Sequence, residues 1–179
     1  GIHSAQGDLK KSFKMRKNCL RIAKKLKNYE EIADSYRGIA YSYQGLRELD
    51  SAKFYFRKLL DLSNDIDYKE GIKSAYNGLA IVAYFMEEDE TTFDYMGRAL
   101  EIVRQLEDKK ELPSALLNYA TAYSIKGYFE KSYPLIAESI EVSSDISDKA
   151  SLAQSYALMG GYLSIYGKYD EANTFLKKT

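Results

Sequence analysis

Residues 35–56, SYRGIAYSYQGLRELDSAKFYF, align with residues 75–96, AYNGLAIVAYFMEEDETTFDYM, when the chain is shifted by 40 residues. The glycine, aliphatic, alanine triplet at residues 38–40 returns at residues 78–80, each time two residues after a tyrosine. A period of this size is typical of stacked arrays of small supersecondary units. The sequence therefore predicts a repeat array, which buries a continuous core between neighbouring repeats and presents a long surface to partners.

The same shift aligns further columns along the chain. Aliphatic residues fill four of them: Ile22, Leu62, Ile102 and Val142; Leu26, Ile66, Leu106 and Ile146; Leu20, Leu60, Leu100 and Ile140; Ile32, Ile72, Leu112 and Leu152. Small residues dominate two others: Ser35, Ala75, Ala115 and Ser155; Ala40, Ala80, Ala120 and Gly160. The aliphatic columns predict the core, and the small columns predict close helix crossings, where the second of them should meet Ala52, Thr92, Ser132 and Ala172.

Each 40-residue repeat has the pattern of two helices joined by a short turn. From Tyr29 to about Leu46, apolar residues recur with the three- and four-residue spacing of an amphipathic helix, and a second such pattern runs over residues 51–63. Gly127 and Gly167 mark turns in the third and fourth repeats. Gly7 falls in the same register, so a break is expected there too. Short connections predict antiparallel neighbours.

The predicted organisation is a single repeat domain over residues 1–179. It consists of a lone helix at 8–26, helix pairs at 29–66, 69–106 and 109–146, and a partial pair at 149–179. Natural arrays end in capping repeats with a polar outer face, and neither end of this chain clearly has one. We therefore expect a fragment of a longer protein, in which the uncapped ends leave room for self-association.

The composition excludes several classes of protein. The 179 residues are 45% hydrophobic and 29% charged, which is normal for a folded soluble domain. No apolar run approaches the roughly 18 residues of a membrane span, and no signal peptide is visible, so we predict no membrane insertion and a cytoplasmic location. A single cysteine, Cys19, and a single histidine, His3, exclude an internal disulfide and most zinc or histidine-based sites.

Charge is unevenly distributed along this neutral chain. Residues 1–27 contain nine Lys or Arg residues and one acid, Asp8, so the remaining residues carry a net charge of −8. One interpretation is a solvated helix face. The other is a docking face for an acidic partner or for an adjacent segment of the parent chain.

At this point the residues resemble the tetratricopeptide repeat family. That family's pattern is an aromatic, Leu-Gly or Leu-Ala and Tyr on the first helix, then a turn glycine and spaced alanines on the second. The fourth repeat matches it at Tyr156, Met159-Gly160, Gly167, Tyr169 and Ala172, and the third at Leu116, Tyr119-Ala120, Tyr123, Gly127 and Tyr128-Phe129. The second repeat matches at Tyr76, Leu79-Ala80 and Ala99, and the first at Tyr36, Ile39-Ala40, Tyr43, Ala52 and Phe56.

The common form of this repeat has 34 residues. The period of 40 is similar to the long-repeat subgroup of Rap-type regulators, kinesin light chains and spindle-orientation scaffolds, whose joint punctuation resembles Leu106–Lys109 and Ile146–Lys149. The resemblance implies an all-α, right-handed helix-turn-helix solenoid of about four repeats, with incomplete ends. It also implies a concave groove, lined by the first helices, that binds peptides, partner proteins or a neighbouring domain.

By the family's geometry, the groove residues lie one turn apart on the first helices and off the packed columns. The resemblance places there Asp34, Arg37, Tyr41, Gln44, Asn77, Ile81, Tyr84, Leu117, Asn118 and Thr121. Arg37 and Asn77 occupy corresponding turns and can hydrogen-bond a peptide backbone or carboxylate, although both also fit ordinary solvated positions. Ile81, Tyr84, Phe85, Leu117 and Ile125 predict an apolar middle of the groove, unless some of them pack against the next helix.

Other functions are disfavoured. Members of this family bind the carboxylates of chaperone tails with a clamp of mainly basic residues. That clamp is absent here, since its neighbourhood holds Ser74, Asn77, Ser114 and Leu117. The lysines of residues 10–27 lie on several sides of a helix, which argues against nucleic-acid binding. No phosphate-binding loop, nucleophile constellation or metal-ligand cluster is present, and the acids at 87–90 fit a solvated turn. We therefore predict no enzymatic activity, no metal and no cofactor.

The predicted function is that of a protein- or peptide-binding scaffold. The alternative is a regulatory sensor that binds a signal peptide or a linked domain and switches an output domain of the parent protein. A third interpretation is a structural stacking segment without a ligand. A sensor should change its curvature on binding, whereas a scaffold should bind with little change.

Substitution of Ala120 by leucine tests the predicted close crossing. A leucine at a packed helix crossing should overfill it, and we expect the free energy of unfolding to fall by about 1–3 kcal/mol. Thermal or denaturant unfolding followed by circular dichroism measures the change. An unaltered unfolding midpoint would show that the repeat register is wrong.

Overall fold

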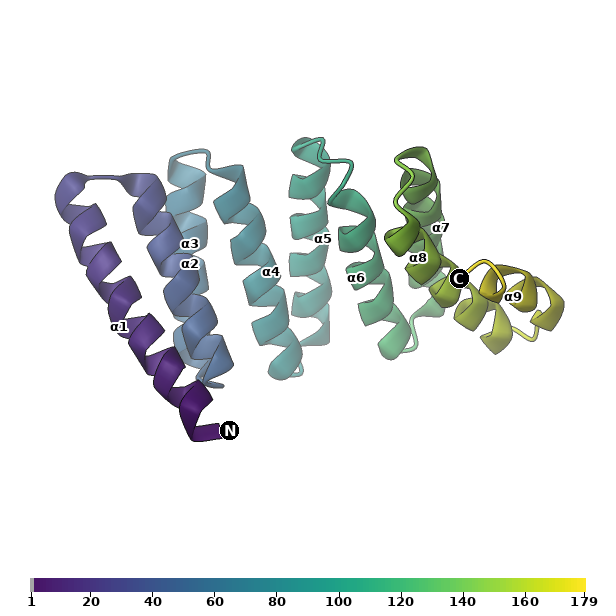
Figure 1. Ribbon diagram of the computed structural model, residues 1–179, viewed down its shortest axis with the longest axis horizontal. Coiled ribbons are helices and arrows are strands. Elements are labelled where there is room, and N and C mark those ends of the chain that lie inside the picture. Colours follow the sequence, from purple (N-terminus) through teal and green to yellow (C-terminus); the bar gives the residue numbers. More distant parts are fainter. Residues whose placement is uncertain (1) are drawn as a thin grey trace. The chain divides into compact units, whose positions relative to one another are not determined.

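The computed structural model describes the backbone of residues 2–179, and side chains for Phe13 and residues 15–179. Helices make up the described chain, with no strand among those residues (Figure 1). In chain order they are α1 Ile2–Leu26, α2 Tyr29–Gly45, α3 Leu49–Asp65, α4 Lys69–Phe85, α5 Asp89–Gln105, α6 Leu112–Ile125, α7 Phe129–Asp145, α8 Lys149–Ile165 and α9 Tyr169–Leu176. The predicted all-α repeat fold is confirmed.

Contacts divide the chain into two compact bodies. The N-terminal body ends at Ile102 and contains α1 to α4 with most of α5, while the C-terminal body runs from Val103 to Thr179. The division falls inside α5. The organisation of residues 1–179 as one domain stays a prediction.

The first helix is longer than expected. The sequence predicts a lone helix at 8–26 with a break at Gly7, but α1 begins at Ile2 and continues through that glycine. Glycine inside a helix costs only about 1 kcal/mol relative to alanine, so one glycine does not force a break. The predicted start at residue 8 is therefore wrong.

The third helix pair also begins differently. The sequence places its start at 109, but residues 109–111 form a turn and α6 begins at Leu112. Pro113 lies in the first turn of α6, where its missing N–H is not needed for helical bonding. The Asp108 carboxylate accepts hydrogen bonds from the backbone N–H groups of Lys110 and Glu111, at 2.9 and 3.2 Å, and stabilises this turn.

The joints between helices repeat every 20 residues. Positive φ angles occur at Lys27, Arg47, Asp67, Glu87, Glu107, Gly127, Ser147 and Gly167. At most of these joints the next backbone N–H bonds back to the carbonyl five residues earlier, as in Glu48 to Tyr43 at 3.0 Å and Tyr128 to Tyr123 at 2.9 Å. This is the Schellman ending of a helix. Two of these positions are glycine, so six side chains accept the left-handed conformation that glycine adopts without cost.

Two joints carry side-chain caps. The Asn28 side chain accepts a hydrogen bond from the backbone N–H of Glu31 at 3.2 Å, and Asp148 accepts from Ala150 and Ser151 at 3.1 and 3.2 Å. These bonds satisfy N–H groups that have no partner inside the helix. Hydrogen bonds from the Ser151 hydroxyl and from the backbone N–H groups of Ser151 and Ala150 lower the pKa of the Asp148 carboxyl group. The polar residues at these joints thus fix where α2 and α8 begin.

The N-terminal body is held together by the packing of α3 between α2 and α4. Tyr55 of α3 contacts the rings of Tyr36 and Tyr43 of α2, with centroids 6.1 and 5.6 Å apart. On its other side α3 presents Phe56, whose fully buried ring lies directly over Gly78 of α4. Phe56 also meets the Tyr41 ring of α2, so α3 is held to both the preceding and the following helix.

The C-terminal body has its own core. Ala120, Ile136, Met159, Leu163 and Ala172 form one buried cluster. A side chain added at Gly160 would reach within 3.4 Å of the Ala172 carbonyl, so α8 and α9 approach closely at the predicted crossing. The other six residues of the two crossing columns, Ala40, Ala80, Ala120, Ala52, Thr92 and Ser132, are all buried.

Gly78→Ala should destabilise the chain because its methyl group would collide with the fully buried Phe56 ring, which would have to shift. We expect a loss of about 1–3 kcal/mol in the free energy of unfolding. Gly161→Ala is the matched control, since nothing lies within 4 Å of its added methyl group. The free energy of unfolding of the control should rise by about 0.5–1 kcal/mol, because alanine has a higher helix propensity than glycine. Denaturant unfolding of both variants measures these changes, and equal effects would contradict the packing described.

Candidate binding surface

The first helices of the first two repeats, α2 and α4, lie against each other in the N-terminal body. Seven of the residues predicted to bind partners come from them: Asp34, Arg37, Tyr41, Gln44, Asn77, Ile81 and Tyr84. We call this set the α2/α4 surface. Tyr41 and Ile81 are 40 residues apart and are 42% and 40% exposed, although the alanines that precede them are buried. Equivalent positions on neighbouring helices thus present apolar side chains to solvent.

The polar end of the α2/α4 surface is already paired. Arg37 Nη2 lies 3.0 Å from Asp34 Oδ1, and the Tyr68 hydroxyl donates a hydrogen bond to the same carboxylate oxygen at 3.3 Å. Burial and the nearby charge of Asp34 raise the pKa of Tyr68. Because a guanidinium has five N–H donors and Asp34 binds one nitrogen, further N–H groups of Arg37 remain for another acceptor.

Tyr41 and Gln44 lie further along α2. The Tyr41 ring meets Phe56 edge-on, with centroids 5.1 Å apart, so the core ring holds the exposed one in place. Burial raises the pKa of Tyr41, and the charge of Arg37 partly offsets the shift. The side-chain oxygen of Gln44 is buried and has no hydrogen-bond partner among the described residues. Asn77, on α4, is exposed.

The apolar end of the surface is formed by neighbouring rings. Tyr84 and Phe85 are 40% and 41% exposed and contact each other with centroids 5.7 Å apart. The Arg47 guanidinium lies 4.2 Å from the centre of the Phe85 ring, a distance at which a cation is attracted to the ring face. The repeat pattern gives no indication of this contact, because Arg47 stands at a turn position where the third and fourth repeats have glycine.

The C-terminal body contains the remaining predicted residues, and they differ in burial. Asn118 is exposed and Thr121 is partly exposed, both on α6. Leu117 is only 4% exposed, so its prediction as a surface contact is wrong. A leucine side chain gains about 1.5–3 kcal/mol from full burial, which favours a core position for Leu117. Ile125, at the end of α6, is 65% exposed.

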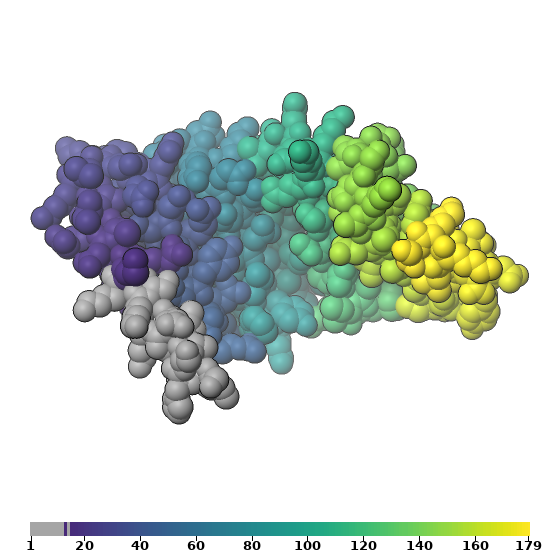
Figure 2. All heavy atoms as spheres, in the orientation of Figure 1, coloured from purple at the N-terminus to yellow at the C-terminus, as the bar shows by residue number. Residues whose placement is uncertain are grey.

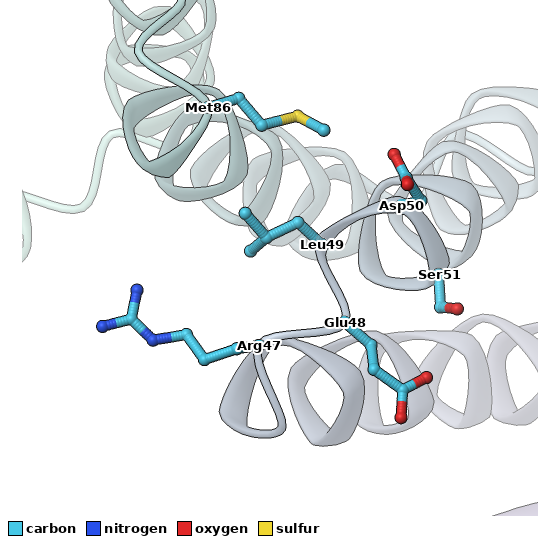
Figure 3. A pocket seen from close by; sticks show the side chains of 6 residues that line it. All are labelled: Arg47, Glu48, Leu49, Asp50, Ser51 and Met86. Atoms are coloured by element: carbon cyan, nitrogen blue, oxygen red, sulfur yellow. The ribbon is translucent and has the colours of Figure 1, made fainter.

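A shallow pocket of about 440 Å³ lies beside the α2–α3 turn (Figure 3). It is lined by Arg47, Glu48, Leu49, Asp50, Ser51 and Met86. Leu49 and Met86 pack against the core of the N-terminal body, and the charged side chains at the rim point in different directions. Because no group of polar atoms converges in this pocket, it has no feature of a chemical site.

Two features are absent from the part of the chain whose side chains the structure describes. No group of three or more His, Cys, Asp or Glu residues could hold a metal ion there. Within the same residues, no helix is both long and apolar enough to cross a bilayer.

Comparisons of the fold identify similar structures. BtubC (BKLC) from P. vanneervenii has a TM-score of 0.85 and 18% identity, over 99% of this chain and 74% of that one. A putative kinesin light chain from Podosopora anserina with nearly identical TPR-like repeats has a TM-score of 0.77 and 13% identity, over 99% and 88% of the two chains. A Rap protein complexed with Competence and Sporulation Factor has a TM-score of 0.75 and 16% identity, over 93% and 47%.

The fold is a tetratricopeptide-like repeat fold. No protein-family model matches the sequence, and a search of curated proteins finds no similar one. The TPR-like fold is thus shared with proteins whose sequences agree at fewer than one position in five. What these proteins have in common with the chain is the packing of helices.

Replacement of Tyr68 by phenylalanine should change how stability depends on pH. The pKa of Tyr68 is raised in the folded chain, so its contribution is complete below the unfolded value of about 10 and is lost as pH rises through the folded value. Between pH 8 and 11, as the experimental range, wild type should lose more stability than Tyr68→Phe. Urea unfolding at each pH measures the difference. Parallel stability curves for the two proteins would contradict the environment described for Tyr68.

Proposed function

We propose that this chain is a non-catalytic module that binds a protein or a peptide through the first helices of its repeats. The observation that carries the proposal is the exposure of large apolar side chains at equivalent positions of α2 and α4. Tyr41, Ile81, Tyr84 and Phe85 are each about two-fifths exposed. Exposed apolar groups that gather on one surface are typical of partner sites, and aromatic rings are frequent anchors there.

The polar residues beside these rings suit a peptide. Arg37 keeps N–H donors beyond its pair with Asp34, and the exposed Asn77 has both a donor and an acceptor. A peptide backbone presents the complementary carbonyl and N–H groups. An extended segment with an apolar side chain over Tyr41 and Ile81 and a backbone carbonyl or carboxylate at Arg37 would use both parts of the α2/α4 surface.

A sensor role is the second candidate. It is favoured by the similarity to the Rap protein that was solved with Competence and Sporulation Factor. In that role the bound peptide, or another domain of the parent protein, would shift the chain between two conformations. Small-angle scattering distinguishes the candidates, since a sensor should change its radius of gyration on binding and a scaffold should not.

A pull-down from source-cell lysate tests the binding surface. The surface variant changes Arg37, Asn77 and Tyr84 to alanine, and a variant matched in composition changes Arg57, Asn64 and Phe54 on α3, which are also exposed. Wild type and the α3 variant should retain the same partner, which the surface variant should lose. Circular dichroism first confirms that all three proteins are folded.

Two results would contradict the proposal. Equal recovery of the partner by the surface variant would place binding elsewhere. The absence of a partner for all three proteins would argue for a purely structural segment.

A further inference from the structure

The first helix, α1, contacts α2 in the same way that α3 contacts α4. The Arg16 side chain lies directly over Gly38 of α2, just as Phe56 lies over Gly78 of α4. Both pairs are related by the same 40-residue shift. The helix α1 therefore packs on α2 as α3 packs on α4, and it occupies the place of the second helix of a repeat.

The second helix of a complete repeat, such as α3, also contacts the first helix of its own repeat through another side. Tyr55 contacts the two tyrosine rings of α2, and Leu59 of the same side is fully buried. Leu62 and Ile66 continue this side and are partly buried. In a complete repeat, this side is thus covered by the first helix of that repeat.

The corresponding residues of α1 are uncovered. They are Met15, Cys19, Ile22 and Leu26, and we call them the α1 face. Met15 is 68% exposed, Ile22 49% and Leu26 73%, and Cys19 is exposed. Their spacing of four, three and four residues places them on one side of the helix. Figure 1 shows α1 as the outermost helix of the N-terminal body, and its described atoms form an edge of that body in Figure 2.

The charged residues that α1 itself places around the α1 face are all basic. Residues 13–27 contain seven Lys or Arg residues and no acid. At 100° per residue, Arg16 and Lys25 lie about a quarter turn to either side of the face. Two copies of this face would bring like charges together, which disfavours pairing of the chain with itself there. The end formed by α9 is also unsuitable, because α9 is itself the second helix of a repeat.

We propose that the α1 face is a docking site for an amphipathic helix of a partner, apolar on one side and acidic along its edges. The helix α2 illustrates the apolar part of this chemistry, since it covers the equivalent side of α3 with Tyr36, Ala40 and Tyr43, spaced four and three residues apart. Its acids, Glu30, Glu31 and Asp34, lie on the other side of the helix and give it a net negative charge. The site is separate from the α2/α4 surface.

Two peptides from the chain itself are suitable probes. Residues 28–46 carry a net charge of −2 and residues 68–86 a net charge of +1, when the ends are acetylated and amidated. Both have the apolar pattern of a first helix, and the basic peptide is the more apolar of the two, so tighter binding of the acidic peptide would have to come from its charge. The acidic peptide should bind the 179-residue chain more tightly than the basic one, and salt should weaken its binding because exposed charges are screened.

Cys19 supplies the local measurement because it is the only cysteine of the chain and lies in the α1 face. Its alkylation by iodoacetamide should slow about tenfold when the acidic peptide is present at ten times its Kd, since about one site in eleven then remains free. Slow alkylation that depends on protein concentration without peptide would identify a second copy as the occupant and overturn the proposal.

Ile22→Glu tests the face, and Ile125→Glu is the control at an exposed isoleucine of α6. Both variants should keep the circular dichroism of wild type. Affinity for the acidic peptide should fall at least about tenfold for Ile22→Glu, because a carboxylate would replace a buried apolar side chain in the contact and would repel the acidic peptide, and should be unchanged for Ile125→Glu. Absence of binding by wild type, binding that leaves Cys19 alkylation unchanged, or equal affinities of both variants would each overturn the proposal. The α2/α4 surface variant should bind the peptide as wild type does.

Discussion

Close approach of helix backbones is the constraint on which this structure depends. Phe56 is fully buried because Gly78 has no side chain to hold α4 away from it. The same requirement explains the small residues that recur where the two helices of a repeat cross, down to Gly160 beside Ala172. Helices of this length are marginal alone in water, so each one depends on the faces that its neighbours cover.

That dependence connects the fold to the two proposed surfaces. A helix inside the array packs two of its sides against neighbouring helices, and only the residues between these sides can contact a partner. On α2 and α4 those residues are Tyr41 and Ile81, which remain exposed beside buried alanines. On α1 a whole side is available, because no described helix takes the place that α2 takes on α3.

The residues that repeat and those that vary have different roles. The joint positions keep one backbone conformation at 20-residue intervals with several different side chains, so hydrogen bonding of the backbone fixes the geometry and leaves the side chain free. At Arg47 that freedom places a cation over Phe85. Variation at such positions changes the surface of the protein without changing its fold, which is consistent with TPR-like neighbours that share under a fifth of their residues with this chain.

The sequence by itself determined the all-α repeat fold, because the 40-residue period and the helical spacing of apolar residues are local properties of the chain. The resemblance to the tetratricopeptide repeat family also indicated the positions Tyr41, Ile81 and Tyr84, which are exposed. Only the tertiary structure shows that Leu117 is buried. Periodicity indicates the side of the helix on which a residue lies, but not whether another helix covers that side. The structure also begins α1 at Ile2 and α6 at Leu112, which differs from the prediction because a single glycine is tolerated inside a helix and a proline fits its first turn. Finally, the exposure of Ile22 and Leu26 is seen only in the structure, since both have the same pattern in the sequence as their partly buried equivalents Leu62 and Ile66.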